Sequence, residues 1–200
     1  MTMFKWVAPV YDLAMNVVGH GSSLEKLAGI IEPGGGENLL DLGGGTGQLL
    51  DYLPADVKVT LVDSSEAMLA RAEKKQREQK VQYIQARGDD MPLEDESFDY
   101  AVIADALHHF QGIGETIDEL ARVIKPEGEL YIMEFDPDSP LTKFISGAES
   151  LAGEPANFFR PQELSGLLAE RGFVVEKKRI SSSLYVLKGI RKVSGLAASG

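Results

Sequence analysis

Hydrophobic and polar residues follow two periodicities along the chain, and these predict strands and helices in alternation. Short, largely apolar runs are typical of buried strands, whereas apolar residues three and four positions apart are typical of amphipathic helices. Strands are predicted at 38–43, 57–63, 81–86, 97–105, 129–135, 173–180 and 183–192. The helical pattern occurs at 20–36, 48–54, 64–79, 114–128 and 160–172. Each of the first five strands is therefore separated from the next by a helix or a loop, and two strands follow each other at the end.

Capping signals predict where one helix begins and where another ends. The helix after the second strand is expected to start at Ser64 or Ser65, and the helix before the fifth strand to end at Pro126 and Gly128. The basic run "RAEKKQREQK", residues 71–80, is interleaved with acidic and amide side chains and is interpreted as a solvated helix face.

Strands that alternate with helices predict an α/β fold. We expect a doubly wound, mostly parallel seven-stranded sheet with helices on both faces and a C-terminal antiparallel hairpin. A single domain is expected over 1–192, with 1–32 as an N-terminal cover, 136–160 as a short lid insertion and 193–200 as a flexible tail. Ligands of such sheets bind beyond the carboxyl ends of the strands, where the strand order reverses.

The composition of the chain mainly excludes certain partners, sites and membrane segments. A net charge of −11 does not suit a protein that grips phosphate backbones, so no nucleic-acid partner is expected. The absence of cysteine excludes disulfides, thiolate metal sites and cysteine nucleophiles together. No apolar run approaches the roughly 18 residues of a membrane span, and the start shows no secretory signal. We expect a cytoplasmic protein with no transmembrane segment and at most peripheral membrane contact.

Four glycines in five positions follow the first predicted strand, in the segment "DLGGGTG". Glycine costs conformational entropy, so either the backbone must turn sharply there or a ligand must approach it closely. A dinucleotide fingerprint would need glycine where Gln48 stands, and a phosphate-binding loop would need a lysine after the glycines. Asp41 precedes the loop, and Asp63 ends the second strand, where a carboxylate can accept ribose hydroxyls. A nucleoside with positive charge and no phosphate fits both acids, and S-adenosylmethionine is such a ligand.

Four segments in order, "LLDLGGGTG", "LVDSSEAML", "MPLEDESFDYAVIADALHHF" and "LARVIKPEGELYIMEF", resemble successive motifs of the class I S-adenosylmethionine-dependent methyltransferases. Within that superfamily the chain is most similar to the ubiquinone/menaquinone biosynthesis C-methyltransferases, through "FKWVAPVYDLAMN", "IMEFDPDSPL" and the C-terminal segment. The resemblance implies a Rossmann-like enzyme that methylates a small aromatic or quinone-type acceptor at carbon or oxygen. The quinone enzymes carry Arg-Asn where this chain has His108-His109, so other acceptors stay open.

Carried over by position, the resemblance implies cofactor contacts for the glycine loop and the residues around it. Asp63 would bind the ribose, and Met68 would either cover the adenine or pack in the core. Arg87 stands where the family uses an acid or amide at the adenine edge, so the Gly88 amide and Asp89 are the candidates for that role. The full set of candidate cofactor-binding residues is Tyr11, Asp41, Gly43, Gly44, Gly45, Gly47, Asp63, Ser64, Met68, Gly88, Asp89 and Asp105.

Candidate catalytic groups lie after the fourth predicted strand and in the N-terminal cover. An acceptor hydroxyl needs a base, and His108 and His109 titrate in a useful range, with Tyr11 as a third candidate. No metal is expected, because no third ligand stands at a matching spacing to the histidines. The small-molecule acceptor is expected to enter between the Tyr11 segment and the 136–160 insertion. A non-catalytic module that binds a nucleoside and interacts with a partner is the alternative.

Overall fold

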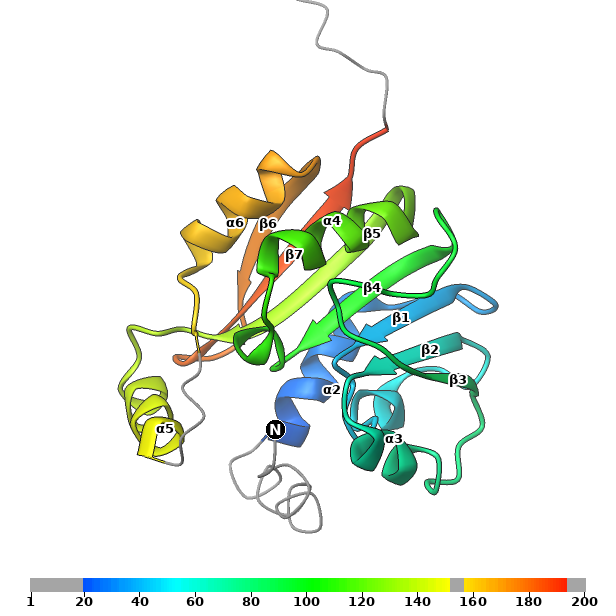
Figure 1. Ribbon diagram of the computed structural model, residues 1–200, viewed down its shortest axis with the longest axis horizontal. Helices are drawn as coiled ribbons and strands as arrows, with labels where there is room; N and C mark the ends of the chain where they lie inside the picture. Colours follow the sequence, from blue (N-terminus) through cyan, green and yellow to red (C-terminus); the bar gives the residue numbers. More distant parts are fainter. Residues whose placement is uncertain (1–19, 152–156, 194–200) are drawn as a thin grey trace, which may run out of the picture.

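The computed structural model describes residues 20–151 and 157–193 of the 200-residue chain. Seven strands in these ranges form one sheet in the order β3-β2-β1-β4-β5-β7-β6 (Figure 1). The first five strands run parallel, whereas β7 pairs antiparallel with β5 and β6. This confirms the predicted doubly wound sheet with a C-terminal hairpin. The strands are β1 (Asn38–Leu42), β2 (Lys58–Asp63), β3 (Lys80–Gln85), β4 (Phe98–Ala104), β5 (Ile124–Phe135), β6 (Phe173–Arg179) and β7 (Leu184–Arg191).

Helices cover both faces of the sheet (Figure 1). One face is covered by α2, α3 and the short 3-10 helix η1, and the other by α4 and α6. A second 3-10 helix, η2, directly follows β4, and α5 follows β5. Their bounds are α2 (His20–Ile31), η1 (Leu49–Tyr52), α3 (Glu66–Ala72), η2 (Leu107–His109), α4 (Ile113–Val123), α5 (Pro140–Leu151) and α6 (Pro161–Glu170).

The central strands contribute to two apolar layers, because successive residues of a strand point to opposite faces. In β1, Leu39 packs in the layer with α2 and η1, whereas Leu40 and Leu42 pack in the layer with α4 and α6. In β4, Val102 belongs to the first layer and Ile103 to the second. Burial on both faces explains why these strands read as continuous apolar runs in the sequence.

Helix α3 ends at Ala72, whereas the sequence pattern predicted a helix as far as Gln79. The chain turns after Ala72, and the Arg77 Nη1 donates a hydrogen bond of 2.9 Å to the Ala72 carbonyl oxygen. That carbonyl is one of those that a helix end leaves without an intrahelical partner. Ser65 occupies the N-cap position, within the predicted pair, but its side chain makes no capping hydrogen bond.

Helix α4 also ends earlier than predicted, at Val123, and both Pro126 and Gly128 lie inside β5. The reason is long-range pairing: Ile124 is already paired with Phe98 of β4 and is fully buried. The register between the two strands shifts directly after this pair, in the manner of a bulge, so the proline does not interrupt regular ladder hydrogen bonds. Sheet pairing therefore ends the helix before the local Pro-Gly signal.

The strand order reverses between β1 and β4, so the carboxyl ends of these strands define the expected ligand position. Tyr11 lies outside the described residues, and the predicted domain limits, cover and tail stay predictions. Helix α5 lies within the predicted 136–160 insertion. In the part of the chain that the structure describes, no helix has the length and apolar character needed to cross a membrane.

Candidate cofactor and catalytic site

A pocket opens at the carboxyl ends of β1, β2 and β4, where the strand order reverses. The glycine loop after β1 forms one wall, the turn after β2 a second, and the segment after β4 a third. This is the position that ligands occupy in doubly wound sheets. The residues lining it are Leu24, Asp41, Gly43, Gly44, Gly45, Thr46, Gln48, Leu49, Asp63, Ser64, Ser65, Met68, Ala104, Asp105, Ala106, His109 and Phe110.

The glycines of the loop are required for two different reasons. Gly43, Gly45 and Gly47 have φ angles of 73°, 56° and 70°, a left-handed region that glycine adopts without strain. At Gly44 the reason is space, since a Cβ there would lie 2.5 Å from Oδ2 of Asp41. A Cβ on Gly45 would meet nothing within 4 Å, and this residue lines the pocket. The loop thus turns tightly around Asp41 and leaves open space at Gly45.

A buried arginine holds the glycine loop from outside the pocket lining. The Arg77 side chain is 5% exposed, and its Nη2 donates hydrogen bonds to the carbonyl oxygens of Thr46 (3.2 Å) and Gly47 (2.5 Å). Because Nη1 also binds the carbonyl oxygen of Ala72, one guanidinium connects the loop to the end of α3. The interpretation of 71–80 as a solvated helix face is therefore wrong for Arg77.

Asp41 is a buried acid whose carboxylate lacks hydrogen bonds from the described part of the chain. It is 1% exposed, and neither carboxylate oxygen has a hydrogen-bond partner among residues 20–151 and 157–193. Desolvation raises the pKa of Asp41 to about 7; the charge of Asp63 also raises it and that of Arg77 lowers it. A buried carboxylate in this state is unfavourable unless a cation or an N–H donor approaches it. Asp41 therefore fits a ligand with positive charge, such as the ammonium and sulfonium groups of S-adenosylmethionine.

Asp63, at the end of β2, is held by the backbone on either side of the pocket. Its Oδ2 accepts the Gly45 N–H at 2.9 Å, and its Oδ1 accepts the Ser65 N–H at 2.8 Å. Burial raises the pKa of Asp63 more than these two bonds lower it. Each oxygen can accept a further hydrogen bond, which suits the two hydroxyls of a ribose. Ser64 and Met68 also line this wall, and Met68 is buried as well, so its role as a cover for the adenine stays a prediction.

The residues predicted to bind the adenine edge lie outside the pocket lining. Asp89 is engaged by Arg87, whose Nε and Nη2 donate to the two carboxylate oxygens at 2.8 and 2.6 Å. Gly88 backs onto α4, where a Cβ would lie 3.1 Å from Cγ2 of Thr116. A role for Gly88 and Asp89 in adenine binding stays a prediction, and for Asp89 it requires the pair with Arg87 to open.

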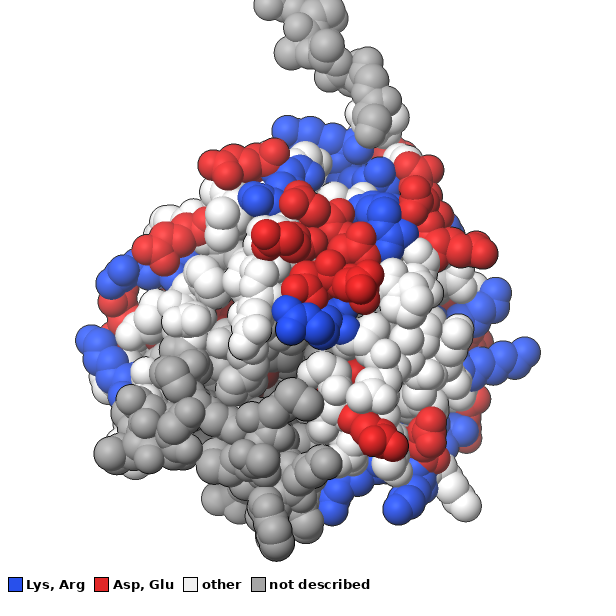
Figure 2. Space-filling view, viewed as in Figure 1, with Lys and Arg blue, Asp and Glu red and all other residues white. Residues whose placement is uncertain are grey.

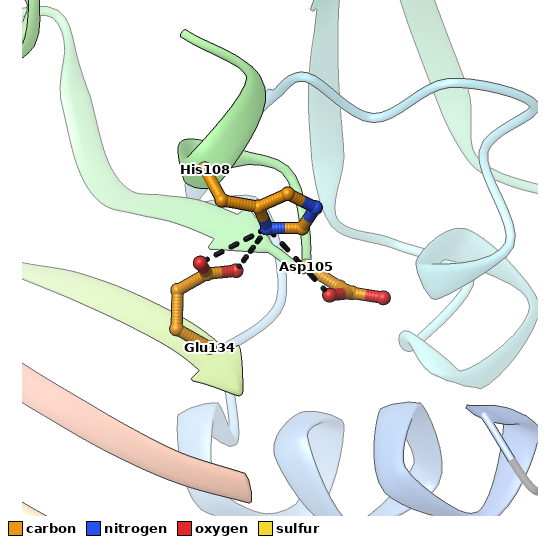
Figure 3. Close-up of side chains that lie close together, drawn as sticks. All are labelled: Asp105, His108 and Glu134. Atoms are coloured by element: carbon orange, nitrogen blue, oxygen red, sulfur yellow. Dashed lines mark hydrogen bonds and ion pairs between the residues drawn. The ribbon is translucent and has the colours of Figure 1, made fainter. Parts of the chain in front are cut away.

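Three titratable side chains meet at the ends of β4 and β5 (Figure 3). The parallel register pairs Ala104 with Met133, which brings the next residues, Asp105 and Glu134, close together. His108 Nδ1 lies 2.9 and 3.0 Å from the two carboxylate oxygens of Glu134 and 3.9 Å from Oδ1 of Asp105. All three residues are buried, and burial raises the pKa of Glu134 although His108 opposes this. Figure 3 shows the second ring nitrogen, Nε2, directed away from Glu134.

Asp105 joins this cluster to the pocket, and its backbone is strained. It lines the pocket and has a φ angle of 54°, which is uncommon for a residue other than glycine. Strain of this kind collects at functional sites, where the surrounding structure holds it in place. The link between pocket and cluster is thus maintained at a conformational cost of roughly 1–3 kcal/mol.

His109 differs from His108 in exposure. Its ring reaches solvent at the pocket rim, with its centroid 4.0 Å from that of His108. Desolvation, together with the charge of His108, lowers the pKa of His109 to about 4, so His109 is neutral at pH 7. On another side, the Phe158 ring packs 4.5 Å from the His108 ring, and the Asn157 N–H donates to the His108 carbonyl oxygen. The end of the predicted lid therefore contacts His108.

Sequence reasoning missed two residues of this region. Glu134 interrupts the apolar run "YIMEF", and a lone acid in a buried strand was the available signal, whereas Arg77 has no local signal at all. The reason for excluding a metal does not hold, because the ligand atoms of Asp105, His108 and Glu134 lie within 4.8 Å of one another. The absence of a metal stays a prediction.

Comparison with known proteins agrees with this geometry. A family model described as a methyltransferase domain matches residues 40–132. An uncharacterized protein of Methanocaldococcus jannaschii is 32% identical over 96% of this chain and 89% of its own length. The ubiquinone/menaquinone biosynthesis C-methyltransferase of Shewanella sediminis is 35% identical over 66% of this chain and 57% of its own length. A solved S-adenosylmethionine-dependent methyltransferase of Thermotoga maritima superposes with a TM-score of 0.77 at 23% identity, over 94% of this chain and 98% of that one.

The chain spans less than two thirds of the length of the quinone methyltransferases that it matches. The residues that the family model matches include the glycine loop, Asp41, Asp63 and the segment after β4, which form most of the pocket lining. From this match, the fold and the fit of Asp41 to a cationic nucleoside, we conclude that the chain belongs to the class I S-adenosylmethionine-dependent methyltransferases, with S-adenosylmethionine as its cofactor and the ubiquinone/menaquinone biosynthesis enzymes among its relatives.

Proposed function

We propose that the enzyme transfers the methyl group to a small aromatic acceptor of the quinol type, at a ring carbon or a hydroxyl oxygen. The observation that carries the proposal is the 35% identity to a ubiquinone/menaquinone biosynthesis C-methyltransferase over 66% of this chain. The walls add support, since Leu24, Ala106 and Phe110 give the pocket apolar surface beside its acids. An aromatic ring is the kind of group that such surface binds.

The proposal includes roles for the cofactor-binding residues. Asp63 binds the two ribose hydroxyls, and Asp41 balances the positive charge of the cofactor. The glycine loop lies against the adenosyl and methionine groups, and the absence of a side chain at Gly45 leaves space for them. Tyr11 is expected to reach the cofactor or the acceptor from the N-terminal cover.

A nucleic-acid acceptor does not fit the charge of the chain. Figure 2 shows a cluster of acidic side chains near the middle of one face, with basic side chains beside it and others scattered at the margins. Recognition of a phosphate backbone requires clustered Lys and Arg. We therefore expect no gel shift with DNA or RNA at physiological ionic strength, and a shift that weakens with salt would contradict this.

The experiment separates cofactor binding from acceptor choice. Calorimetry should show micromolar binding of S-adenosylmethionine, roughly −8 kcal/mol. Turnover is then measured with methyl-labelled cofactor and a short-chain demethylmenaquinol under reducing conditions, with a catechol and a primary amine in parallel. Label in the quinol, at a ring carbon or at a hydroxyl oxygen, supports the proposal. Label only in the amine, or none in the quinol although the cofactor binds, overturns the proposed acceptor class.

A further inference from the structure

We propose that His108 is the general base of the methyl transfer and that Glu134 is the residue that positions it. This inference rests on the proposed function, because it concerns how an acceptor hydroxyl loses its proton. Glu134 lies 26 positions from His108 in the sequence and comes from a different strand. The sheet register brings the two together, and no local sequence pattern joins them.

The contact with Glu134 determines which ring nitrogen can act. Both carboxylate oxygens lie within 3.0 Å of Nδ1. Burial raises the pKa of Glu134 and His108 opposes this, and in the ionised form the carboxylate can only accept a hydrogen bond. The proton of the neutral imidazole is therefore held on Nδ1, which leaves the lone pair on Nε2. The carboxylate also stabilises the imidazolium that forms when Nε2 takes a proton, as in other base–carboxylate pairs.

The other titratable groups around His108 favour the same assignment. Asp105, 3.9 Å from Nδ1, adds a second carboxylate that favours the protonated ring. His109 has its pKa lowered to about 4 and brings no competing charge at pH 7. On β7, Tyr185 is paired in register with Glu134, but its hydroxyl donates to the Phe159 carbonyl oxygen at 2.8 Å. Glu134 is thus available to His108.

The position of His108 is that expected of a base for the acceptor. His108 is buried behind the pocket wall, and its neighbours Asp105 and His109 line the cofactor pocket. Phe158 and Asn157, which contact His108 from another side, belong to the end of the predicted lid insertion. An acceptor that lies between the cofactor and the lid is therefore next to His108.

With a quinol as acceptor, the reaction begins at the hydroxyl group. The acceptor hydroxyl transfers its proton to Nε2 of His108, and the electron pair released into the ring forms the new bond to the methyl group. S-adenosylmethionine, when bound, would supply this methyl group; the carbon–sulfur bond breaks, and its electron pair stays on the sulfur, which becomes neutral. The methylated ring carbon then loses a proton to water, the electron pair of that C–H bond restores the aromatic ring, and His108 returns its proton to the oxygen. One proton is released for each methyl group transferred.

The first test needs no acceptor. Histidine ¹⁵N NMR of the whole chain follows the titration of His108, assigned by the signal missing in His108→Gln. We expect the Nδ1–H tautomer in the neutral ring, and a His108 pKa that falls by about 1 to 3 pH units in Glu134→Gln, because the imidazolium loses an adjacent carboxylate. Glu127→Gln, the same change on an exposed residue near the opposite end of β5, should leave it unchanged. An Nε2–H tautomer, or an equal pKa in Glu134→Gln and wild type, overturns the proposal.

The second test uses turnover of the demethylmenaquinol probe. His108→Gln should lower kcat by about 100-fold or more, and Glu134→Gln by at least about tenfold, with the dissociation constant of the cofactor changed less than twofold. Glu134→Gln should also move the acidic limb of the kcat profile to lower pH, which a loss of packing alone would not do. If EDTA abolishes turnover and Mn²⁺ or Zn²⁺ restores it, the cluster holds a metal and the base assignment is wrong. If the wild type methylates no quinol, the proposed acceptor class is wrong. The NMR titration still tests separately whether Glu134 positions His108.

Discussion

Asp41 offers a direct test of the cofactor site. Its environment should make the stability of the free protein fall as pH rises, whereas the affinity for the cofactor should increase. Its pKa is raised from 3.8 to about 7, first by burial. The folded protein therefore holds a proton that the unfolded chain releases, so stability falls as pH rises from about 4 to about 7. The full difference corresponds to about 4 kcal/mol, of which about 2–3 kcal/mol lies between pH 5 and pH 8.

Asp41→Asn should remove this loss while introducing a buried amide that costs about 1–3 kcal/mol when it has no partner. Urea unfolding is measured at pH 5 and pH 8. From pH 5 to pH 8 the free energy of unfolding of the variant should rise by about 2–3 kcal/mol relative to that of the wild type. Wild type should bind S-adenosylmethionine about tenfold more weakly at pH 6 than at pH 8, because binding needs the ionised acid. The variant should bind more weakly and lose this dependence. A stability difference that does not change with pH would refute the assignment of Asp41.

Three further substitutions test the loop and its support. Asp63→Ala should weaken cofactor binding by about 1–3 kcal/mol in calorimetry, since the ribose hydroxyls lose a charged acceptor; unchanged affinity would contradict its role. Arg77→Gln should lower the free energy of unfolding by about 2–4 kcal/mol, with partial recovery in Arg77→Lys, because three backbone carbonyls lose a charged donor. Gly44→Ala should abolish cofactor binding or folding, because its Cβ would lie 2.5 Å from Asp41, and normal binding would show that the loop can relax.

Local features of the sequence predicted most of the fold. The apolar strands are recognisable because both faces of the central sheet are buried, and the glycine loop because three of its φ angles are left-handed. The helix ends were predicted less well, since they depend on residues far away in the chain. Ile124 enters the sheet through its pairing with Phe98, and no capping signal near Pro126 carries that information.

The same distinction separates the site residues that were predicted from those that were not. Asp41 and Asp63 stand at the ends of recognisable strands next to glycines or serines, so their position follows from order along the chain. Glu134 gains its meaning from the register between β4 and β5, which brings it to His108. Arg77 lies in a run of charges, and its burial follows from a turn that the helical periodicity did not predict.

The buried acids and histidine also indicate where the site lies, independently of the comparisons with known proteins. Among the residues that the structure describes, the buried acids and histidines are Asp41, Asp105, His108 and Glu134. All four lie at or after the carboxyl ends of β1, β4 and β5. Burying such groups costs stability unless they are paired, and apolar residues would pack there without that cost. A fold that is otherwise filled with aliphatic side chains concentrates this cost at one edge, and that is where the function requires ionisable groups.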